Sequence, residues 1–221
     1  MYQTRCNEQR AGFKLRLRNI HALFQPFLAQ KPHGYCVLAF LIALFSVTAT
    51  LPAAAAELAG QALFDRIKQG GVVLMMRHAQ TVPGTGDPAG FKLSDCTTQR
   101  NLSEEGKAQS RRIGAALREA GISPTAVRSS AWCRCKDTAQ LAFGDYRVWS
   151  QLNSFFDART NEPTQTAELV RALQLMKPNQ TEVWITHQVN ITALTGLATA
   201  MGDVVVVRAG SRGVEVIGRL N

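Results

Sequence analysis

The sequence predicts an α/β domain, a three-layer sandwich in which helices flank a mostly parallel central sheet. Two observations support this fold class. Beyond residue 57, apolar segments typical of strands alternate with segments that have helical periodicity. The strand segment at residues 72–76 (VVLMM) is also continuously apolar, as expected for a strand that is buried on both faces.

The elements are expected in a regular order along residues 57–221. Ser103 is expected to cap a helix whose first turn holds Glu104 and Glu105, where the helix dipole favours acidic side chains. The turn residues at 210–213 (GSRG) predict a closing hairpin. The expected helices cover residues 58–69, 103–120, 134–143, 164–176 and 190–201, and the expected strands cover residues 72–76, 125–129, 147–149, 182–186, 204–207 and 214–217.

Residues 1–56 are predicted to be a signal peptide or an N-terminal membrane anchor, and residues 57–221 a single domain. The leader has a basic region, the apolar run 35–51 and the small residues 53–56 (AAAA), in the order typical of a secretory signal. Cleavage near Ala56 would give a periplasmic or secreted protein. The run 35–51 is also long enough to anchor an uncleaved chain in the inner membrane, and in that case alone would the protein contact a membrane.

The positive charge of the chain does not indicate a nucleic-acid-binding protein. The net charge is +9, but residues 1–56 hold six Lys or Arg against one acidic residue. The rest of the chain holds 19 basic and 15 acidic residues. This mild excess suits a protein that handles anions, and no clustered aromatic and basic face accompanies it.

Three cysteines follow the leader, namely Cys96, Cys133 and Cys135. With three thiols, at most one disulfide can form, from Cys96 to either of the other two, and plain buried cysteines are the alternative. The Cys133-x-Cys135 spacing is too tight for a zinc knuckle, and no second pair accompanies it.

Histidine and arginine side chains follow the expected strands where each strand ends. Arg77 and His78 follow the first strand, Arg134 follows the second, and His187 follows the fourth. Ligands bind beyond the carboxyl ends of strands in open α/β sheets. Arginine holds phosphate oxygens, a neutral imidazole can act as a nucleophile, and a second, protonated histidine would add charge at the phosphoryl group. The pattern therefore predicts phosphate chemistry.

Four segments resemble the signatures of the histidine phosphatase superfamily, the phosphoglycerate mutase-like proteins. They are 76–81 (MRHAQT), 101–109 (NLSEEGKAQ), 129–139 (SSAWCRCKDTA) and 183–187 (VWITH). They occur in the family's order and cover most of residues 71–200. The chain thus resembles a small exported bacterial-type member, and the resemblance implies a phosphoglycerate mutase-like fold.

The resemblance assigns catalytic roles to four residues. It implies that His78 is a nucleophile that forms a phosphohistidine intermediate, and that Arg77, Arg134 and His187 form the phosphate pocket. Arg100 and Thr81 are candidate substrate contacts. The implied activity is metal-independent hydrolysis of a phosphomonoester or phosphohistidine. No cofactor is expected, and the partner would be a small phosphorylated substrate or a phosphoprotein.

The family's general acid is absent at both positions where it is expected. Ser154 stands where the mutase branch has an acidic residue, and Gln188 stands where the acid-phosphatase branch has one. Asp157 and Glu162 are nearby candidates for the acid. Without a positioned acid, a phosphatase should prefer leaving groups that depart easily. The alternative function is a non-catalytic protein that binds a phosphorylated ligand in the same pocket.

Overall fold

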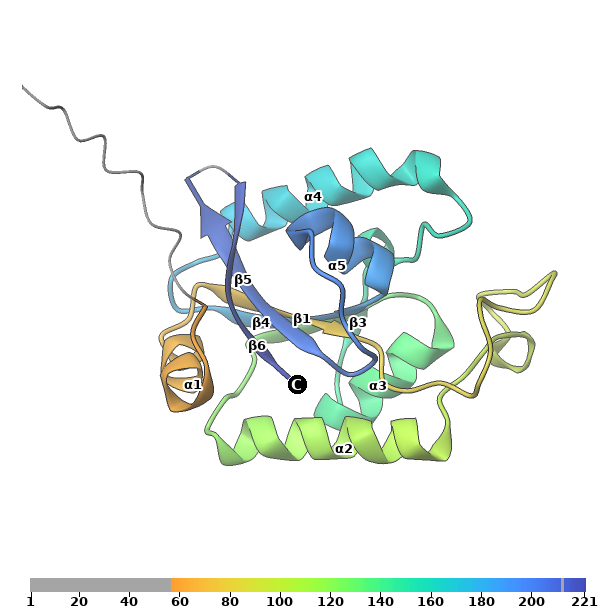
Figure 1. Ribbon diagram of the computed structural model, residues 1–221, viewed down its shortest axis with the longest axis horizontal. Helices are drawn as coiled ribbons and strands as arrows, with labels where there is room; N and C mark the ends of the chain where they lie inside the picture. Colours follow the sequence, from red (N-terminus) through yellow and green to blue (C-terminus); the bar gives the residue numbers. More distant parts are fainter. Residues whose placement is uncertain (1–56, 212) are drawn as a thin grey trace, which may run out of the picture. The chain divides into compact units, whose positions relative to one another are not determined.

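The computed structural model describes residues 57–211 and 213–221, so the predicted signal or anchor at residues 1–56 lies outside the described residues. The described chain forms one six-stranded sheet with helices on both faces (Figure 1). No helix within this part of the chain is long and apolar enough to cross a membrane. The predicted α/β class is confirmed.

The sheet is mixed, with its parallel part at one side. The strands are β1 (Val72–Arg77), β2 (Ala126–Ser129), β3 (Arg147–Val148), β4 (Thr181–Thr186), β5 (Val204–Gly210) and β6 (Gly213–Leu220). Their order is β3-β2-β4-β1-β5-β6. The pairs among β3, β2, β4 and β1 are parallel, whereas β5 pairs with β1 and with β6 in antiparallel fashion. The mostly parallel centre and the closing hairpin were both predicted correctly.

The helices occur close to where the sequence predicts them. They are α1 (Gly60–Lys68), α2 (Glu104–Glu119), α3 (Cys133–Phe143), α4 (Glu162–Gln174) and α5 (Gln188–Thr195), with short 3-10 turns at Cys96–Thr98, Ser150–Leu152 and Arg159–Asn161. Ser103 caps α2 as expected, because its side chain accepts a hydrogen bond from the Gly106 N–H.

The expectation of a helix over residues 190–201 is wrong at its C-terminal end, because α5 stops at Thr195. Gly196 follows with φ of 75°, a left-handed conformation that glycine adopts without strain and that commonly ends helices. The Gly196 N–H closes the helix on the Thr192 carbonyl at 2.8 Å. The segment beyond Gly196 therefore returns across the sheet edge as a loop.

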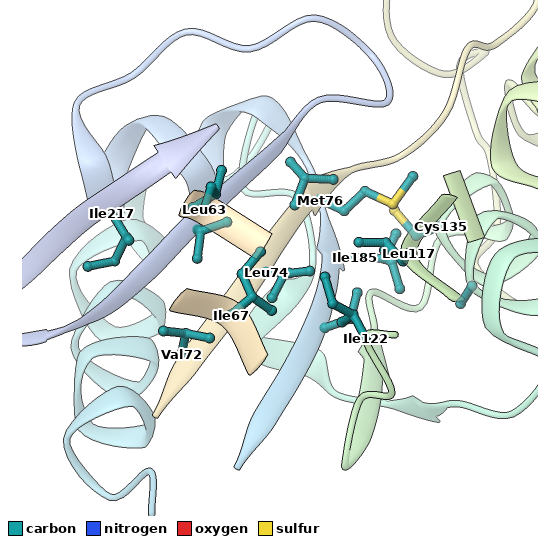
Figure 2. Packing of buried hydrophobic residues seen from close by; sticks show 14 of the residues in the cluster. Leu63, Ile67, Val72, Leu74, Met76, Leu117, Ile122, Cys135, Ile185 and Ile217 are labelled. Carbon is teal, nitrogen blue, oxygen red and sulfur yellow. The ribbon is translucent and has the colours of Figure 1, made fainter. Parts of the chain in front are cut away.

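The two faces of the sheet carry two hydrophobic clusters, which gives the predicted three layers. Alternate residues of β1 point to opposite faces, so Leu74 packs with α1, α2 and α3 while Met75 packs with α4 and α5. Figure 2 shows the first cluster, in which Leu63 and Ile67 of α1 lie against Leu74. Because β1 is buried on both faces, its continuous apolar run is explained.

Two glycines in α2 allow close backbone contacts that shape the site. A Cβ atom at Gly114 would collide with the Ala142 carbonyl oxygen of α3, so only glycine lets these helices pack at this distance. A Cβ atom at Gly106 would collide in the same way with the Gln80 carbonyl oxygen. The start of α2 therefore lies directly against the chain that leaves β1.

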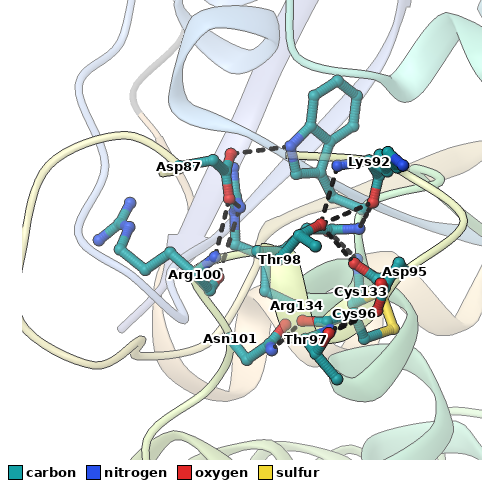
Figure 3. Close-up of a disulfide and its surroundings, with 12 residues drawn as sticks. Asp87, Lys92, Asp95, Cys96, Thr97, Thr98, Arg100, Asn101, Cys133 and Arg134 are labelled. Atoms are coloured by element: carbon teal, nitrogen blue, oxygen red, sulfur yellow. Dashed lines mark hydrogen bonds and ion pairs between the residues drawn. A yellow bond between two sulfur atoms is a disulfide. The ribbon is translucent and has the colours of Figure 1, made fainter. Parts of the chain in front are cut away.

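A disulfide joins Cys96, in the loop between β1 and α2, to Cys133, the first residue of α3 (Figure 3). Of the two pairings that the sequence allows for Cys96, the structure has the one with Cys133, and Cys135 remains a free, buried thiol. Burial raises the pKa of the Cys135 thiol to about 12. The disulfide fixes a long loop to the helix that carries Arg134.

We predict that replacing both Cys96 and Cys133 with Ala lowers the free energy of unfolding by about 2–4 kcal/mol, because the cross-link restricts the unfolded chain. Denaturant titration of the oxidised proteins would measure the loss. A reducing agent should destabilise the wild type by a similar amount and leave the double variant unchanged. A wild type whose stability does not respond to the reducing agent would contradict this prediction.

Candidate active site

Parallel pairing of β1 with β4 brings the two histidines together. Arg77 is in register with Thr186, and the His78 N–H donates a hydrogen bond to the Thr186 carbonyl at 3.0 Å. His78 and His187 therefore leave the same sheet edge from neighbouring strands. Their ring centroids lie 5.5 Å apart with a T-shaped geometry, and both side chains are almost fully buried.

A pocket of about 710 Å³ opens at this edge. Arg77, His78, Arg134 and His187 all line it, together with the candidate substrate contact Arg100. The candidate acids Asp157 and Glu162 also line it. Thr81 is buried beside the wall of this pocket, where its hydroxyl accepts a hydrogen bond from Arg100 Nη1 at 2.7 Å. The structure thus brings the predicted residues together, with Thr81 in contact with Arg100.

The hydrogen bond at His78 fixes the tautomer of its ring. Nδ1 lies 2.9 Å from the Ala79 carbonyl oxygen, which can only accept, so Nδ1 carries the proton. Nε2 then holds a lone pair, and within residues 57–211 and 213–221 no hydrogen bond is made to it. The backbone geometry of the segment after β1 therefore presents the Nε2 lone pair at the pocket.

Burial keeps both imidazoles neutral. It lowers the pKa of His78 to about 3, with smaller contributions from the positive charges of Arg134, Arg77 and Arg100. Burial also holds the pKa of His187 well below its usual value, and His78 and the arginines contribute less to this shift. His187 is therefore neutral in the protein without a bound phosphate, and its protonation during phosphoryl transfer stays a prediction. A bound phosphate dianion would have to raise that pKa before His187 could carry charge.

The contacts of His187 lie on the side of α3. Its Nε2 is 2.9 Å from Ser130 Oγ and 3.5 Å from Cys135 Sγ. The Ser130 hydroxyl also lies 3.2 Å from Asn153 Oδ1, to which it donates. His187 consequently donates its Nε2 proton to Ser130, and the ring orientation is set by this chain of hydrogen bonds.

Three of the four arginines that line the pocket share one pattern of hydrogen bonding. Arg77 donates from Nη1 to Gln188 Oε1 and the Thr199 carbonyl, and Arg100 donates from Nη1 to Thr81 and the Gly84 carbonyl. In both residues, and in Arg134, the buried Nε atom has no hydrogen-bond partner among the described residues. A buried N–H without a partner is costly. The three unpartnered Nε–H groups therefore favour an anion in the pocket.

Asp87 is a site residue that the sequence analysis missed. Its carboxylate forms an ion pair with Arg134 Nη1 at 2.7 Å, and both side chains are only 6% exposed (Figure 3). It also accepts from the Arg100 backbone N–H at 2.9 Å and from Trp132 Nε1 at 3.0 Å. Asp87 lies in a glycine- and proline-rich loop far from α3 in sequence, so no spacing pattern connected it with Arg134.

The two positions where the family acids are expected have other contacts in this protein. Gln188 accepts from Arg77 Nη1 and from the Thr199 backbone, and it donates to Thr192 and the Leu197 carbonyl. Ser154 accepts a hydrogen bond from the Phe156 N–H. Asp157 is exposed and Glu162 is half-buried, and both line the pocket on either side of Arg159 in the sequence. Arg159 also forms an ion pair with Glu162 at 3.7 Å.

The described residues contain no group of three His, Cys, Asp or Glu side chains placed to hold a metal ion. Arg77, Arg100, Arg134 and Arg159 bring positive charge to the pocket. Burial and, after it, the neighbouring arginines lower the pKa of Arg77 and of Arg100. An arginine nevertheless stays protonated at any working pH.

Two neutral histidines and several arginines lie at the carboxyl ends of the parallel strands, an arrangement suited to binding a phosphoryl group. Residues 73–155 match the family described as the histidine phosphatase superfamily (branch 1). This match includes Arg77, His78, Arg100 and Arg134. The segment 73–155 is thus similar to the histidine phosphatase superfamily, a superfamily of phosphatases.

Several solved structures are similar to this chain in backbone structure, although their sequence identity to it is low. The protein histidine phosphatase SixA in complex with tungstate is 15% identical, over 68% of this chain and 96% of that one, with a TM-score of 0.47. Rv3214 from Mycobacterium tuberculosis is 15% identical, over 66% and 94%, with a TM-score of 0.50, which supports a shared fold. A mycobacterial glucosyl-3-phosphoglycerate phosphatase, Rv2419c, is 18% identical, over 66% and 96%, with a TM-score of 0.49. A search of curated proteins found no match.

We predict that the free energy of unfolding falls as the pH drops from about 7 to about 5. The folded state keeps His78 and His187 neutral, while the unfolded state protonates them below about pH 6.5, so stability present above that pH is lost as the pH falls. Each histidine contributes at most about 1.4 kcal/mol per pH unit. Denaturant titrations at several pH values would measure the slope, which His78→Gln should reduce. An unchanged slope in that variant would contradict the prediction.

Proposed function

We propose that this protein hydrolyses phosphomonoesters or phosphohistidine through a phosphohistidine intermediate on Nε2 of His78. The observation that carries the proposal is the hydrogen bond from His78 Nδ1 to the Ala79 carbonyl at 2.9 Å. It leaves the Nε2 lone pair free, and the low pKa of His78 keeps that lone pair unprotonated at neutral pH.

In the first step, Nε2 of His78 attacks the phosphorus atom and the bond to the leaving oxygen or nitrogen breaks. The three guanidinium groups hold the phosphoryl oxygens and stabilise the charge that develops on them. The Ala79 carbonyl stabilises the positive charge that spreads over the phosphorylated ring. In the second step, water attacks the phosphorus atom, inorganic phosphate leaves, and His78 regains its lone pair.

The proposed reaction requires no metal ion, because the guanidinium groups of Arg77, Arg100 and Arg134 supply the positive charge. Each offers an Nε–H group without a partner among the described residues. A guanidinium group also holds two phosphoryl oxygens at once, which orients the phosphorus atom for attack.

We further propose that the substrates have leaving groups that depart easily, or that Asp157 or Glu162 protonates them. These carboxylates are the candidates because Gln188 and Ser154 have replaced the family acids. The predicted export signal at residues 1–56 would place these substrates outside the cytoplasm.

The first test is hydrolysis of para-nitrophenyl phosphate by the full-length protein in excess chelator. We expect turnover by the wild type and a loss of at least about a thousandfold in His78→Ala, because the nucleophile is removed. The control variant Arg111→Ala, on the exposed face of α2, should keep the wild-type rate. A folded wild type that binds phosphate but does not hydrolyse the ester would favour the non-catalytic binding protein instead.

A second test identifies the acid by comparing an aryl with an alkyl substrate. Loss of a general acid slows a poor leaving group by about 10²–10⁴-fold and affects a good one much less. We therefore expect Asp157→Asn or Glu162→Gln to lower kcat for glycerol phosphate far more than for para-nitrophenyl phosphate. If the double variant hydrolyses both esters at wild-type rates, neither residue is the acid.

A further inference from the structure

Asp87 stands apart from the other polar residues of the pocket, because it is a buried carboxylate inside a site built to bind an anion. Its side chain is 6% exposed and lines the same pocket as His78 and the three arginines. A carboxylate at this place repels a phosphate dianion, so it requires a compensating role.

We propose that Asp87 is the positioning residue for Arg134. Asp87 accepts a hydrogen bond from Nη1, and this orients the guanidinium group so that its other N–H groups face the phosphoryl oxygens. The proposal rests on the proposed phosphatase function and adds a residue to it. The hydrogen bonds of the Asp87 side chain run to Arg134, the Arg100 backbone and Trp132, and none runs to His78, so Asp87 acts through Arg134.

The contacts of Arg134 support this role. Its hydrogen bonds are the short one to Asp87 at 2.7 Å and a long one to the Arg100 carbonyl at 3.4 Å, and both come from Nη1. Arg77 and Arg100, in contrast, are each held by two neutral oxygens. Without Asp87, the Arg134 guanidinium would keep only the weak contact, and its orientation would be lost.

Asp87 is itself fixed from two directions. The Arg100 backbone N–H and Trp132 Nε1 donate to its two oxygens, so the carboxylate cannot rotate to follow a moving arginine. The disulfide and a hydrogen bond from the Cys133 N–H to Gln99 Oε1 attach the same loop to α3. The position of Arg134 is thereby tied to the loop between β1 and α2.

The carboxylate is charged in the folded protein. Burial alone would raise its pKa, but the hydrogen bonds from Arg134 and the Arg100 backbone lower it below the usual value. A charged acceptor makes a stronger hydrogen bond than a neutral one. Asp87 therefore accepts a strong hydrogen bond from Arg134, whose second hydrogen bond, to the Arg100 carbonyl, is long.

The test is a double-mutant cycle between Asp87 and Arg134 in the full-length protein, with para-nitrophenyl phosphate as substrate. We expect Asp87→Ala to lower kcat/KM by roughly 10- to 100-fold, because misplacement of a binding group by about 1 Å costs this much. In the Arg134→Ala background, the same change should cost less than about threefold. Asp95→Ala, which removes an exposed carboxylate of the same loop, is the matched control and should keep the wild-type kcat/KM.

An NMR readout tests the proposal without relying on hydrolysis. The Nε–Hε signals of the buried arginines report their orientation and their response to inorganic phosphate. Asp87→Ala should shift or broaden the Arg134 signal, weaken its response to phosphate and leave the Arg77 signal in place. If Asp87→Ala does not fold, Asp87→Asn, which keeps an acceptor oxygen, should show smaller losses with the same dependence on Arg134.

Three results would overturn the proposal. They are an equal loss of kcat/KM in both backgrounds, wild-type or higher kcat/KM in Asp87→Ala, and an Arg134 signal that Asp87→Ala leaves unchanged. A wild type whose arginine signals respond to phosphate but which hydrolyses nothing would refute the phosphatase function, while the NMR comparison would still decide the role of Asp87. A wild type that does neither would refute both.

Discussion

The parallel pairing of β1 with β4 is the constraint on which the rest of the structure depends. These two strands are buried at the centre of the sheet, and their register places Arg77 beside Thr186. The residues that follow, His78 and His187, must therefore emerge side by side. Helices α3 and α5 then start at the same edge, so the pocket is a direct result of the sheet topology.

Several arginine side chains lie close together at this sheet edge and repel one another, and the surrounding oxygen atoms hold them in place by hydrogen bonds. Four arginines line one pocket, and three of them, Arg77, Arg100 and Arg134, are held by oxygen atoms at Nη1 while their buried Nε atoms have no partner among the described residues. Burial keeps the two imidazoles neutral at the same edge. In the proposed reaction, the arginines would carry the charge and His78 would supply the lone pair.

The fold and the residues at the strand ends could be predicted from the sequence because both follow from local patterns. The apolar run of β1 and the cap at Ser103 each depend on a few neighbouring residues. Asp87 could not be predicted, because its partner Arg134 is 47 residues away and the loop between them has no periodic pattern. The choice of Cys133 over Cys135 and the end of α5 at Gly196 likewise depend on tertiary geometry.

The contacts of Gln188 have a consequence for how catalysis could change in this protein. The acid-phosphatase branch of the superfamily has an acidic residue at this position, whereas here the amide is part of the scaffold that supports Arg77 and the loop after α5. A glutamate at this position would lose the two donor contacts to Thr192 and the Leu197 carbonyl. A proton donor placed here would therefore weaken the scaffold that supports Arg77 at the same time.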